Sequence, residues 1–395
     1  MAGVPSARRS LGARAALVAV RWLGVVALTL ALGELAARFV LHQEPLQTEA
    51  MLWQHHPRWG WAHIPDADGV FVKPGFSQSI HINSKGLRER EIPYAKPQGV
   101  TRVLVLGDSS VVGFEVPEEA VFTRVAEARL RERGHAVEFI NAGVRGYGTD
   151  QSLLFLEDEG LRYAPDLVLY KWTDNDRDDN ATIHRPFRKF GKPYFDLDGS
   201  DALVLRGVPV PDYPYGADLR VGHDGEVRSL DVAPSTWITL WFRDVALTHS
   251  AFATALLKAA LAAPSLSQAL IGLGGYDDAQ DVERNLDRSS RLFRVTVAMV
   301  REMQRLSETH GARFRMIAAT GPWGEAVLEN ASMPALGAAE RFRARAPEGA
   351  ALQVPYDPHW NELGHRLYGE ALADALEASG LLQPAPAPQE HAGNG

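Results

Sequence analysis

The chain has 395 residues, a length that suits one main domain with additional segments better than a single minimal domain. Hydrophobic residues make up 46% and charged residues 23%, which is ordinary for a globular protein. The formal net charge of −8, with no basic patch interleaved with aromatic residues, argues against nucleic acid as a partner. The chain has no cysteine, which excludes disulfides, cysteine-based metal sites and thiol catalysis.

Residues 1–41 are predicted to be a membrane anchor or a secretion signal. An apolar stretch runs from Ala15 to Leu41, and its uncharged part, Trp22 to Gly33, has 12 residues. As a helix this part would span about 18 Å, less than the roughly 30 Å hydrocarbon core of a bilayer. A complete span therefore requires Arg21 to extend its side chain to the interface and Glu34 to pair with Arg38.

A cleaved signal peptide also has an apolar region of this length, so both interpretations stay open. The sequence has no small-x-small cleavage site followed by a polar segment, which favours an uncleaved anchor. Basic residues precede or interrupt the stretch: Arg8, Arg9, Arg14 and Arg21. The positive-inside rule then predicts the N-terminus in the cytoplasm and the rest of the chain outside it, in the periplasm or at the cell surface.

Residues 42–100 are expected to form a β-rich lead-in to the main domain. Short runs such as 79–82 have the pattern of strands and are separated by Pro and Gly. Aromatic residues are scattered along this segment: Trp53, Trp59, Trp61, Phe71 and Phe76. His55 and His56 are interpreted as surface or turn residues, because no third histidine or carboxylate stands at a suitable spacing for a metal.

From residue 101 the pattern alternates between strands and helices. Strands are expected at 102–106, 137–140 and 166–171. Helices are expected at 118–133 and from Asp150, interpreted as an N-cap, to Glu159. Such a βαβαβ unit with short connections predicts an α/β fold with a doubly wound parallel sheet in three α/β/α layers.

Between about 177 and 281 this alternation stops. A hairpin is expected from 193–197 and 202–205, followed by a helical run near 236–262. We interpret this segment as an insertion beside the site that forms a lid or a substrate wall. Its apolar residues are interpreted as packing residues rather than as a ligand site: Trp237, Leu240 and Trp241.

The alternation resumes with a helix at 284–309, a strand at 314–318 and a final helix at 362–378. The main domain is therefore assigned to residues 101–383. Residues 384–395 alternate Pro and Ala before a polar end and are expected to be a disordered tail.

Four polar segments stand directly after an expected strand or just before the final helix. They are Gly107-Asp108-Ser109-Ser110, Asn141 to Gly148, Thr173-Asp174-Asn175-Asp176, and Asp357-Pro358-His359-Trp360-Asn361. The carboxyl ends of parallel strands meet at one edge of a sheet, where the ligands and catalytic groups of open α/β sheets collect. The four segments are therefore expected to meet there.

In this order the segments resemble the Ser, Gly, Asn and Asp/His blocks of the SGNH (GDSL-type) hydrolase superfamily. The resemblance extends from about Val103 to Ala378, with a long unmatched stretch inside. It implies a flavodoxin-like sheet and a serine ester hydrolase or O-acyltransferase of the membrane-anchored bacterial envelope type, with no cofactor or metal. It implies nothing firm about the substrate beyond a small acyl ester.

A serine hydroxyl becomes a good nucleophile only when a base takes its proton. His359 is the expected base for Ser109, and Asp357 is expected to orient the imidazole. The superfamily usually spaces this pair as Asp-x-x-His, and here the spacing is Asp-x-His. Both side chains of an extended Asp-x-His stretch project to one face, so contact is feasible. His365 is the rival base, but it falls inside the expected final helix and is interpreted as structural.

Acyl transfer also needs donors for a developing oxyanion. The resemblance assigns this role to the backbone N–H groups of Ser109 and Gly146 and to the side-chain amide of Asn175. Gly143 is the alternative within its segment. Thr173 stands where the superfamily usually has Gly, which leaves the local backbone there open.

Other motifs fit less well. The run from Asp174 to Asn180 resembles the start of a calcium loop, but it lacks the Gly at the sixth position and has Arg185 at the twelfth, so a solvated acidic turn is expected. Gly107 to Gly113 lacks the Lys-Ser/Thr pair of a phosphate loop. Neither Gly-x-Ser-x-Gly nor His-Glu-x-x-His occurs, which argues against an ordinary α/β-hydrolase and a zinc hydrolase.

These observations predict an extracytoplasmic serine esterase or acyltransferase that acts on small acyl esters, including O-acyl groups of envelope or exported polysaccharide. The alternative is a non-catalytic carbohydrate-binding or envelope assembly protein that retains the fold. The short Asp-x-His spacing and Thr173 are the features that favour this alternative.

Overall fold

The computed structural model describes most of the chain, namely residues 6–43, 45, 52–73, 76–185, 189–213, 217–222, 224–231, 234–263, 266, 286–318, 321–355 and 357–382. It divides the chain into two compact units. The helical unit comprises Met1–Thr48, Val72–Pro74 and Ile238–Gly275. The sheet unit comprises Glu49–Phe71, Gly75–Trp237 and Tyr276–Gly395. The expected tail at 384–395 lies outside the described residues.

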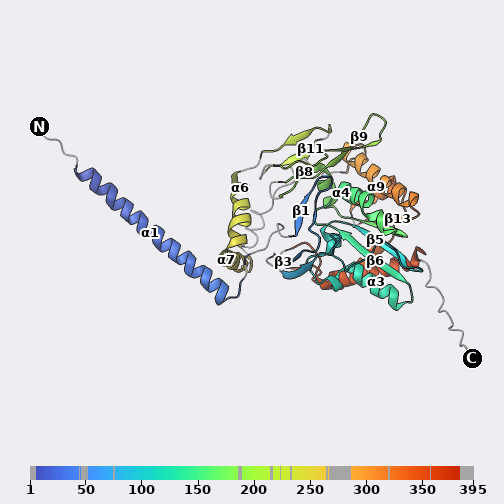
Figure 1. The fold of residues 1–395 in the computed structure, drawn as a ribbon, viewed down its shortest axis with the longest axis horizontal. Coiled ribbons are helices and arrows are strands. Elements are labelled where there is room, and N and C mark those ends of the chain that lie inside the picture. The colour runs from blue at the N-terminus through green and yellow to red at the C-terminus, as the bar shows by residue number, and fades with distance from the viewer. Residues whose placement is uncertain are drawn as a thin grey trace, which may run out of the picture. The chain divides into compact units, whose positions relative to one another are not determined.

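A four-stranded parallel sheet organises the sheet unit (Figure 1). Its strands are β5 (Thr101–Gly107), β6 (Val137–Gly143), β7 (Leu167–Trp172) and β13 (Arg313–Ala318), in the order β13-β7-β5-β6. The parallel α/β sheet expected from the sequence is confirmed. Because the chain adds β6 on one side of β5 and β7 on the other, the strand order reverses at β5, and ligands of such sheets bind at this reversal.

Helices pack on both faces of this sheet, because successive residues of a buried strand point to opposite sides. On one side, Val103 and Val105 share an apolar cluster with α3 (Phe122–Glu132) and α12 (Glu362–Ala378). On the other side, Leu104 and Leu106 share a cluster with α4 (Thr149–Asp158) and α9 (Arg291–Thr309). Two shorter helices, α10 (Pro322–Asn330) and α11 (Ala338–Arg345), complete the C-terminal half.

Some expected helix limits are wrong. The helix expected at 118–133 is a 3₁₀ turn, η2 (Glu118–Ala120), followed by α3, because Val121 has an extended backbone between them. Helix α4 has Gly148 at its N-cap rather than Asp150. Asp150 is instead buried in the first turn, where its carboxylate accepts a hydrogen bond from Lys192. Helix α9 begins only at Arg291, capped by the Ser290 hydroxyl.

The segment that interrupts the alternation contributes to both units. In the sheet unit it forms the expected hairpin, β9 (Tyr194–Leu197) with β10 (Leu203–Arg206). A second small sheet contains β8 (Thr182–His184), β11 (Leu219–Val221) and β12 (Val227–Ser229). The helical run expected near 236–262 is divided into α6 (Pro234–Trp241), the π-helical segment η4 (Phe242–Leu247) and α7 (Ala251–Leu261).

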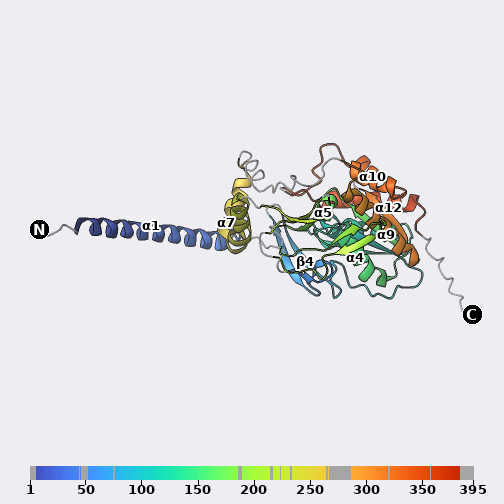
Figure 2. The ribbon, with the colours of Figure 1, turned by 90° about the horizontal axis from the view of Figure 1, so that it is seen from above.

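Helix α1 (Ser6–Phe39) is the longest helix of the helical unit (Figure 2). Its part from Arg14 to Phe39 is long and apolar enough to cross a membrane, a property that a signal sequence shares. Glu34 and Arg38 form the pair that a complete span requires, with 2.6 Å between carboxylate and guanidinium.

The described part of the lead-in segment carries four strands in two pairs: β1 (Trp53–His56), antiparallel to β2 (Gly60–His63), and β3 (Asp68–Lys73) with β4 (Phe76–His81). Arg88 follows these strands and is 2% exposed. Its guanidinium donates to the carbonyl oxygens of Val112 (3.0 Å), Gly113 and Val116 (2.6 Å). The lead-in therefore fixes the backbone that follows the Ser109 segment.

Replacing Arg88 with Met should remove a charged hydrogen-bond donor from three carbonyl oxygens, those of Val112, Gly113 and Val116. We expect the free energy of unfolding to fall by about 3 kcal/mol or more, because hydrogen bonds from charged groups contribute about 1.5–3 kcal/mol each. Urea unfolding followed by tryptophan fluorescence measures this change. Arg129→Met is the matched control, because its pairs with Glu132 and Glu370 are at the surface and should contribute less than about 1 kcal/mol. Equal losses in the two variants would contradict the role given to Arg88.

Candidate active site

Ser109 lies where the central strand β5 ends. Strand β5 finishes at Gly107, whose φ is +152°, and a Cβ there would lie 2.6 Å from Cγ2 of Val111. This close approach requires glycine. The chain then turns through Asp108, the N-cap of the short helix α2 (Ser109–Val112). Ser109 is the first residue of that helix and faces a cavity of about 220 Å³.

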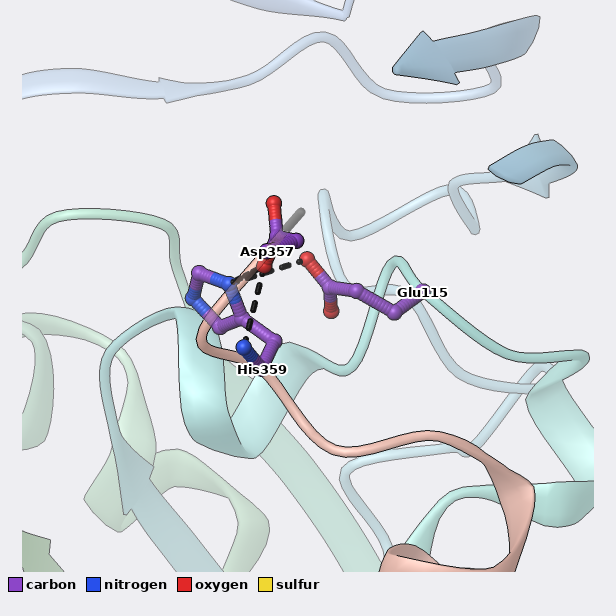
Figure 3. A group of neighbouring side chains, drawn as sticks. All are labelled: Glu115, Asp357 and His359. Atoms are coloured by element: carbon purple, nitrogen blue, oxygen red, sulfur yellow. Dashed lines mark hydrogen bonds and ion pairs between the residues drawn. The ribbon is translucent and has the colours of Figure 1, made fainter. Parts of the chain in front are cut away.

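His359 comes from the loop before α12, and it contacts Ser109 across 250 residues of sequence. Its Nε2 lies 2.7 Å from the Ser109 Oγ, and its Nδ1 is hydrogen-bonded to Oδ1 of Asp357 (Figure 3). The backbone N–H of His359 also donates to that oxygen, at 3.0 Å. The three residues expected to act together are thus in a continuous hydrogen-bonded chain.

The Asp357–His359 contact forms in a bend rather than in an extended stretch, so the expected extended conformation is wrong. The two-residue spacing works because the Asp357 carboxylate turns back onto the backbone N–H of His359. Burial raises the pKa of Asp357, but the hydrogen bonds and charge of His359 outweigh it and lower the pKa to about 2. Asp357 is therefore ionised at neutral pH and can stabilise a positively charged imidazole.

A second carboxylate, Glu115, lies beside the same ring nitrogen. Its Oε1 is 3.5 Å from Nδ1 of His359, and its side chain has no exposed surface (Figure 3). Arg145, from the Gly segment, donates a hydrogen bond to this oxygen. The sequence analysis missed Glu115, because it belongs to none of the four segments and only the tertiary fold brings it to His359.

The buried carboxylate of Asp108 links the Ser and Asn segments. Oδ1 accepts hydrogen bonds from the Ser110 N–H (2.9 Å) and hydroxyl (2.7 Å). Oδ2 accepts from the Thr173 hydroxyl and the Asn175 amide, both at 2.9 Å. Burial raises the pKa of Asp108. The positive charge of Lys171 and these hydrogen bonds outweigh that effect, so the pKa lies below its ordinary value. Thr173 therefore has a defined role at the position where the superfamily usually has Gly.

The acidic run after β7 forms a helix, α5 (Asn175–Ala181), with one side buried, so the expected solvated turn is wrong. Asp176 is 1% exposed and accepts a hydrogen bond from the Thr173 N–H at 2.6 Å. Burial and the nearby charge of Asp108 raise its pKa well above the ordinary value. Asp179 is also buried; it accepts from the Asn175 amide and pairs with Arg185 at 3.2 Å. Asp179 therefore helps to hold the side-chain amide of Asn175.

Of the residues expected to bind an oxyanion, Asn175 lines the cavity and Gly146 is not among the described residues that line it. The Nδ2 of Asn175 donates to Asp108 and Asp179, both at 2.9 Å. An oxyanion would compete with these carboxylates for the amide hydrogens. Gly146 lies in the turn after β6 with φ +73°. Gly143 packs tightly on α2, since a Cβ there would lie 2.4 Å from the Val112 nitrogen.

Lys171, at the end of β7, supplies a positive charge in the cavity wall. Its Nζ donates to the Ser110 hydroxyl at 2.8 Å and lies 4.9 Å from the ring centroid of Trp360. Burial lowers the pKa of Lys171, while Asp108 and Asp176 oppose that effect. The sequence analysis placed Lys171 in a strand without assigning it a role, although a charged residue in an apolar strand is a usable signal.

His365 lines the cavity but is held for structure. Its Nδ1 accepts a hydrogen bond from the Phe122 N–H at 3.3 Å, and its ring stacks on Phe122. Burial lowers its pKa to about 3, and nearby positive charges add to that effect. A histidine with so low a pKa is a weak base at neutral pH, so the geometry favours His359 as the proton acceptor.

The ligand atoms of Glu115, Asp357 and His359 lie within 4.8 Å of one another, close enough to hold a metal ion. The guanidinium of Arg145 already contacts Glu115, and the Nε2 of His359 is directed to Ser109. The arrangement therefore suits proton transfer better than metal binding.

Comparison with known proteins finds no matching family model. A curated arylesterase of Vibrio mimicus is 34% identical over 82 residues, which are 21% of this chain and 41% of that protein. The chain thus matches about two fifths of the length of this curated relative. This similarity is consistent with the resemblance of the four segments to the GDSL/SGNH lipases and esterases.

Solved structures that the chain is similar to include TesA, with 12% identity, a TM-score of 0.36 and coverage of 71% of this chain and 100% of that one. The lipase/acylhydrolase from Enterococcus faecalis has 13% identity, a TM-score of 0.35 and coverage of 73% and 100%. A GDSL-like lipase from Bacteroides thetaiotaomicron has 11% identity, a TM-score of 0.31 and coverage of 73% and 93%. At these TM-scores the overlap is partial, and the chemistry is inferred from the residues of the site.

The two carboxylates beside His359 predict a graded response to mutation. Asp357→Asn should lower kcat/KM for a small acyl ester by about 10²–10⁴-fold, because the imidazolium loses its hydrogen-bonded anion. Glu115→Gln should lower it by about tenfold, because the charge is lost at a longer distance. The acid limb of the pH profile of kcat/KM should move to lower pH in both variants.

Glu119→Gln is the control, because Glu119 is exposed near the same loop. It should leave both kcat/KM and the pH profile unchanged. An unchanged pH profile in Glu115→Gln would show that Glu115 supports only the local fold.

Proposed function

We propose that this protein is a serine ester hydrolase of the SGNH superfamily. One observation carries the proposal: Ser109 Oγ lies 2.7 Å from Nε2 of His359, whose Nδ1 is bound to ionised Asp357, at the wall of a cavity. Nucleophile, base and orienting acid in this arrangement are the parts that acyl transfer requires. The proposal includes a doubly wound, three-layer domain with the 177–281 insertion.

In the proposed reaction, Ser109 attacks the ester carbonyl while His359 takes the hydroxyl proton. Asp357 stabilises the resulting imidazolium, and Glu115 adds negative charge on the same side. The tetrahedral intermediate collapses when His359 returns the proton to the leaving alcohol, which leaves an acyl group on Ser109. Water, activated by His359, then releases the acid. A sugar hydroxyl in place of that water would make the same residues an acyltransferase.

By resemblance to the superfamily, we assign the oxyanion donors as the backbone N–H groups of Ser109 and Gly146 and the amide of Asn175. Gly146 is outside the described residues that line the cavity, so its assignment rests on the resemblance alone. Support for Asn175 is its place at the cavity, next to Asp108. The cavity of about 220 Å³ is smaller than the roughly 300–1,000 Å³ of drug-sized ligand sites, which favours a small acyl group. By resemblance, such groups include the O-acyl substituents of envelope or exported polysaccharide.

The non-catalytic alternative loses the features that favoured it. The short Asp-x-His spacing still allows contact of Asp357 with His359, and Thr173 donates a hydrogen bond to Asp108. Neither departure from the superfamily pattern breaks the site. We therefore retain the enzyme as the proposed function.

Labelling with a fluorophosphonate tests the proposal, because only an activated serine reacts rapidly with it. Ser109→Ala and His359→Ala should abolish labelling and lower kcat by at least about 10³-fold. Ser110→Ala removes the neighbouring hydroxyl, which donates to Asp108. Labelling in this variant should be slower but not abolished, because the nucleophile and its base remain. Labelling that survives in Ser109→Ala but disappears in Ser110→Ala would contradict the nucleophile assignment. Loss of labelling in His365→Ala but not in His359→Ala would contradict the base.

We further propose that α1 is an uncleaved membrane anchor and that the site lies outside the cytoplasm. The support is the arginine cluster before the apolar stretch. A second support is that Glu34 accepts hydrogen bonds from the N–H groups of Ala251 and Phe252, both at 3.0 Å. Cleavage after α1 would leave these helix-end donors without that acceptor.

Protease added to intact spheroplasts tests this topology. A chain with a C-terminal epitope should lose the epitope without lysis, because the positive-inside rule predicts the domain outside. A cytoplasmic marker protein should survive in the same sample. Full protection of the epitope until the spheroplasts are lysed would place the domain in the cytoplasm and contradict the prediction.

A further inference from the structure

Helix α6 and the segment η4 expose large apolar side chains at positions that share one helix face. Ile238 is 70% exposed, Trp241 59%, Phe242 41% and Val245 45%. Their spacing is i, i+3, i+4 and i+7, the pattern of a helix side that a globular protein normally buries. We call these four residues the apolar ridge. Exposed apolar surface of this kind marks a place of contact with a partner or a membrane.

The sequence led us to interpret Trp237, Leu240 and Trp241 as packing residues. Trp237 is 43% and Trp241 59% exposed, so the interpretation is wrong for these two, and the Leu240 side chain lies outside the described ones. Nearby in sequence, Leu256 on α7 is 54% exposed as well. The ridge and α7 belong to the same compact unit as α1.

Helix α7 is fixed to α1 by a set of polar contacts. The Glu34 carboxylate accepts from the Ser250 hydroxyl at 2.7 Å and from the Ala251 and Phe252 N–H groups at 3.0 Å. Arg38 donates to the His249 carbonyl at 3.2 Å. Phe252 packs directly on α1 at Gly33, where a Cβ would lie 2.9 Å from the ring. The first turn of α7 is therefore held at the level of Glu34.

The length of α1 indicates where Glu34 would lie relative to a bilayer that α1 crosses. From Arg14 to Glu34 the helix advances by 20 residues, or about 30 Å, which is the thickness of the hydrocarbon core of a bilayer. An anchor that starts at Arg14 thus brings Glu34 to the opposite headgroup region, where a carboxylate and its polar partners are tolerated. The start of α7, hydrogen-bonded to Glu34, lies in that same region.

We propose that the apolar ridge lies in the headgroup region of the bilayer that α1 crosses, as a second attachment parallel to the membrane surface. Tryptophan and phenylalanine on a helix face are suited to this boundary, where apolar rings enter the acyl edge. The proposal rests on α1 as an anchor and is independent of the ester chemistry. It assigns part of the 177–281 insertion to the membrane surface, where the sequence analysis expected a lid or a substrate wall.

The absence of cysteine allows a direct test with single labels. Ile238→Cys, Phe242→Cys and Val245→Cys variants of the full chain would each carry an NBD fluorophore and be reconstituted in phosphatidylcholine and phosphatidylglycerol vesicles. Quenching is measured with iodide in water and with lipids that carry a doxyl group near the headgroup or near the chain end. Val25→Cys, midway along the span, is the lipid control, and Ser200→Cys, in the exposed β9–β10 hairpin, is the water control.

Ridge labels should be quenched at least about twofold more by doxyl near the headgroup than by doxyl near the chain end, as for a shallow interfacial helix. Val25 should show the reverse order, and Ser200 should respond only to iodide. Each variant should keep wild-type fluorophosphonate labelling of Ser109, which reports folding and tests the ester chemistry separately.

Ridge labels that respond to iodide alone, with Val25 quenched by lipid, would overturn the ridge proposal and leave the anchor standing. Ridge labels shielded from both quenchers would overturn it in favour of contact with a second copy of the chain. A Val25 label that lipid does not quench would overturn both the anchor and the ridge.

Discussion

The site depends on one buried carboxylate, that of Asp108. An ionised group that is 1% exposed is stable only if charge and hydrogen bonds replace its lost hydration. Asp108 obtains both: Ser110 and Thr173 donate to it, Asn175 donates its amide, and Lys171 supplies positive charge. Because these partners come from the ends of β5 and β7, satisfying Asp108 forces the two strand ends into one arrangement. Ser109 directly follows Asp108, so these contacts also fix its position.

The same constraint explains why departures from the superfamily pattern are tolerated. Thr173 has a side chain where Gly is usual, yet its hydroxyl joins the Asp108 network instead of obstructing it. In the acidic run after it, the buried Asp179 accepts a hydrogen bond from the Asn175 amide and pairs with Arg185. A network in which every donor has a defined acceptor rigidifies a site, and rigid placement is what a nucleophile next to its base requires.

Sequence reasoning found the elements whose information is local. Strand β5 and helix α12 were predicted nearly to the residue, because one is an uninterrupted apolar run and the other begins at an Asn361 cap. Sequence reasoning failed where a residue's position depends on partners that are distant in the sequence. Asp150 is of a residue type that commonly caps helices, but it is buried and hydrogen-bonded to Lys192 instead. Nothing near Glu115 in the sequence indicates that it lies beside His359. Trp241 was interpreted as a packing residue but is 59% exposed, because composition alone does not show which apolar side chains the fold buries.

His359 has two carboxylates beside Nδ1, that of Asp357 and that of Glu115. With one intervening residue, Asp357 must turn back on its own backbone, and its Oδ1 accepts from both the N–H and the Nδ1 of His359. Glu115, buried and fixed by Arg145, adds negative charge on the same side of the ring. In the proposed reaction, the positive charge on the imidazole would therefore face two carboxylates, those of Asp357 and Glu115.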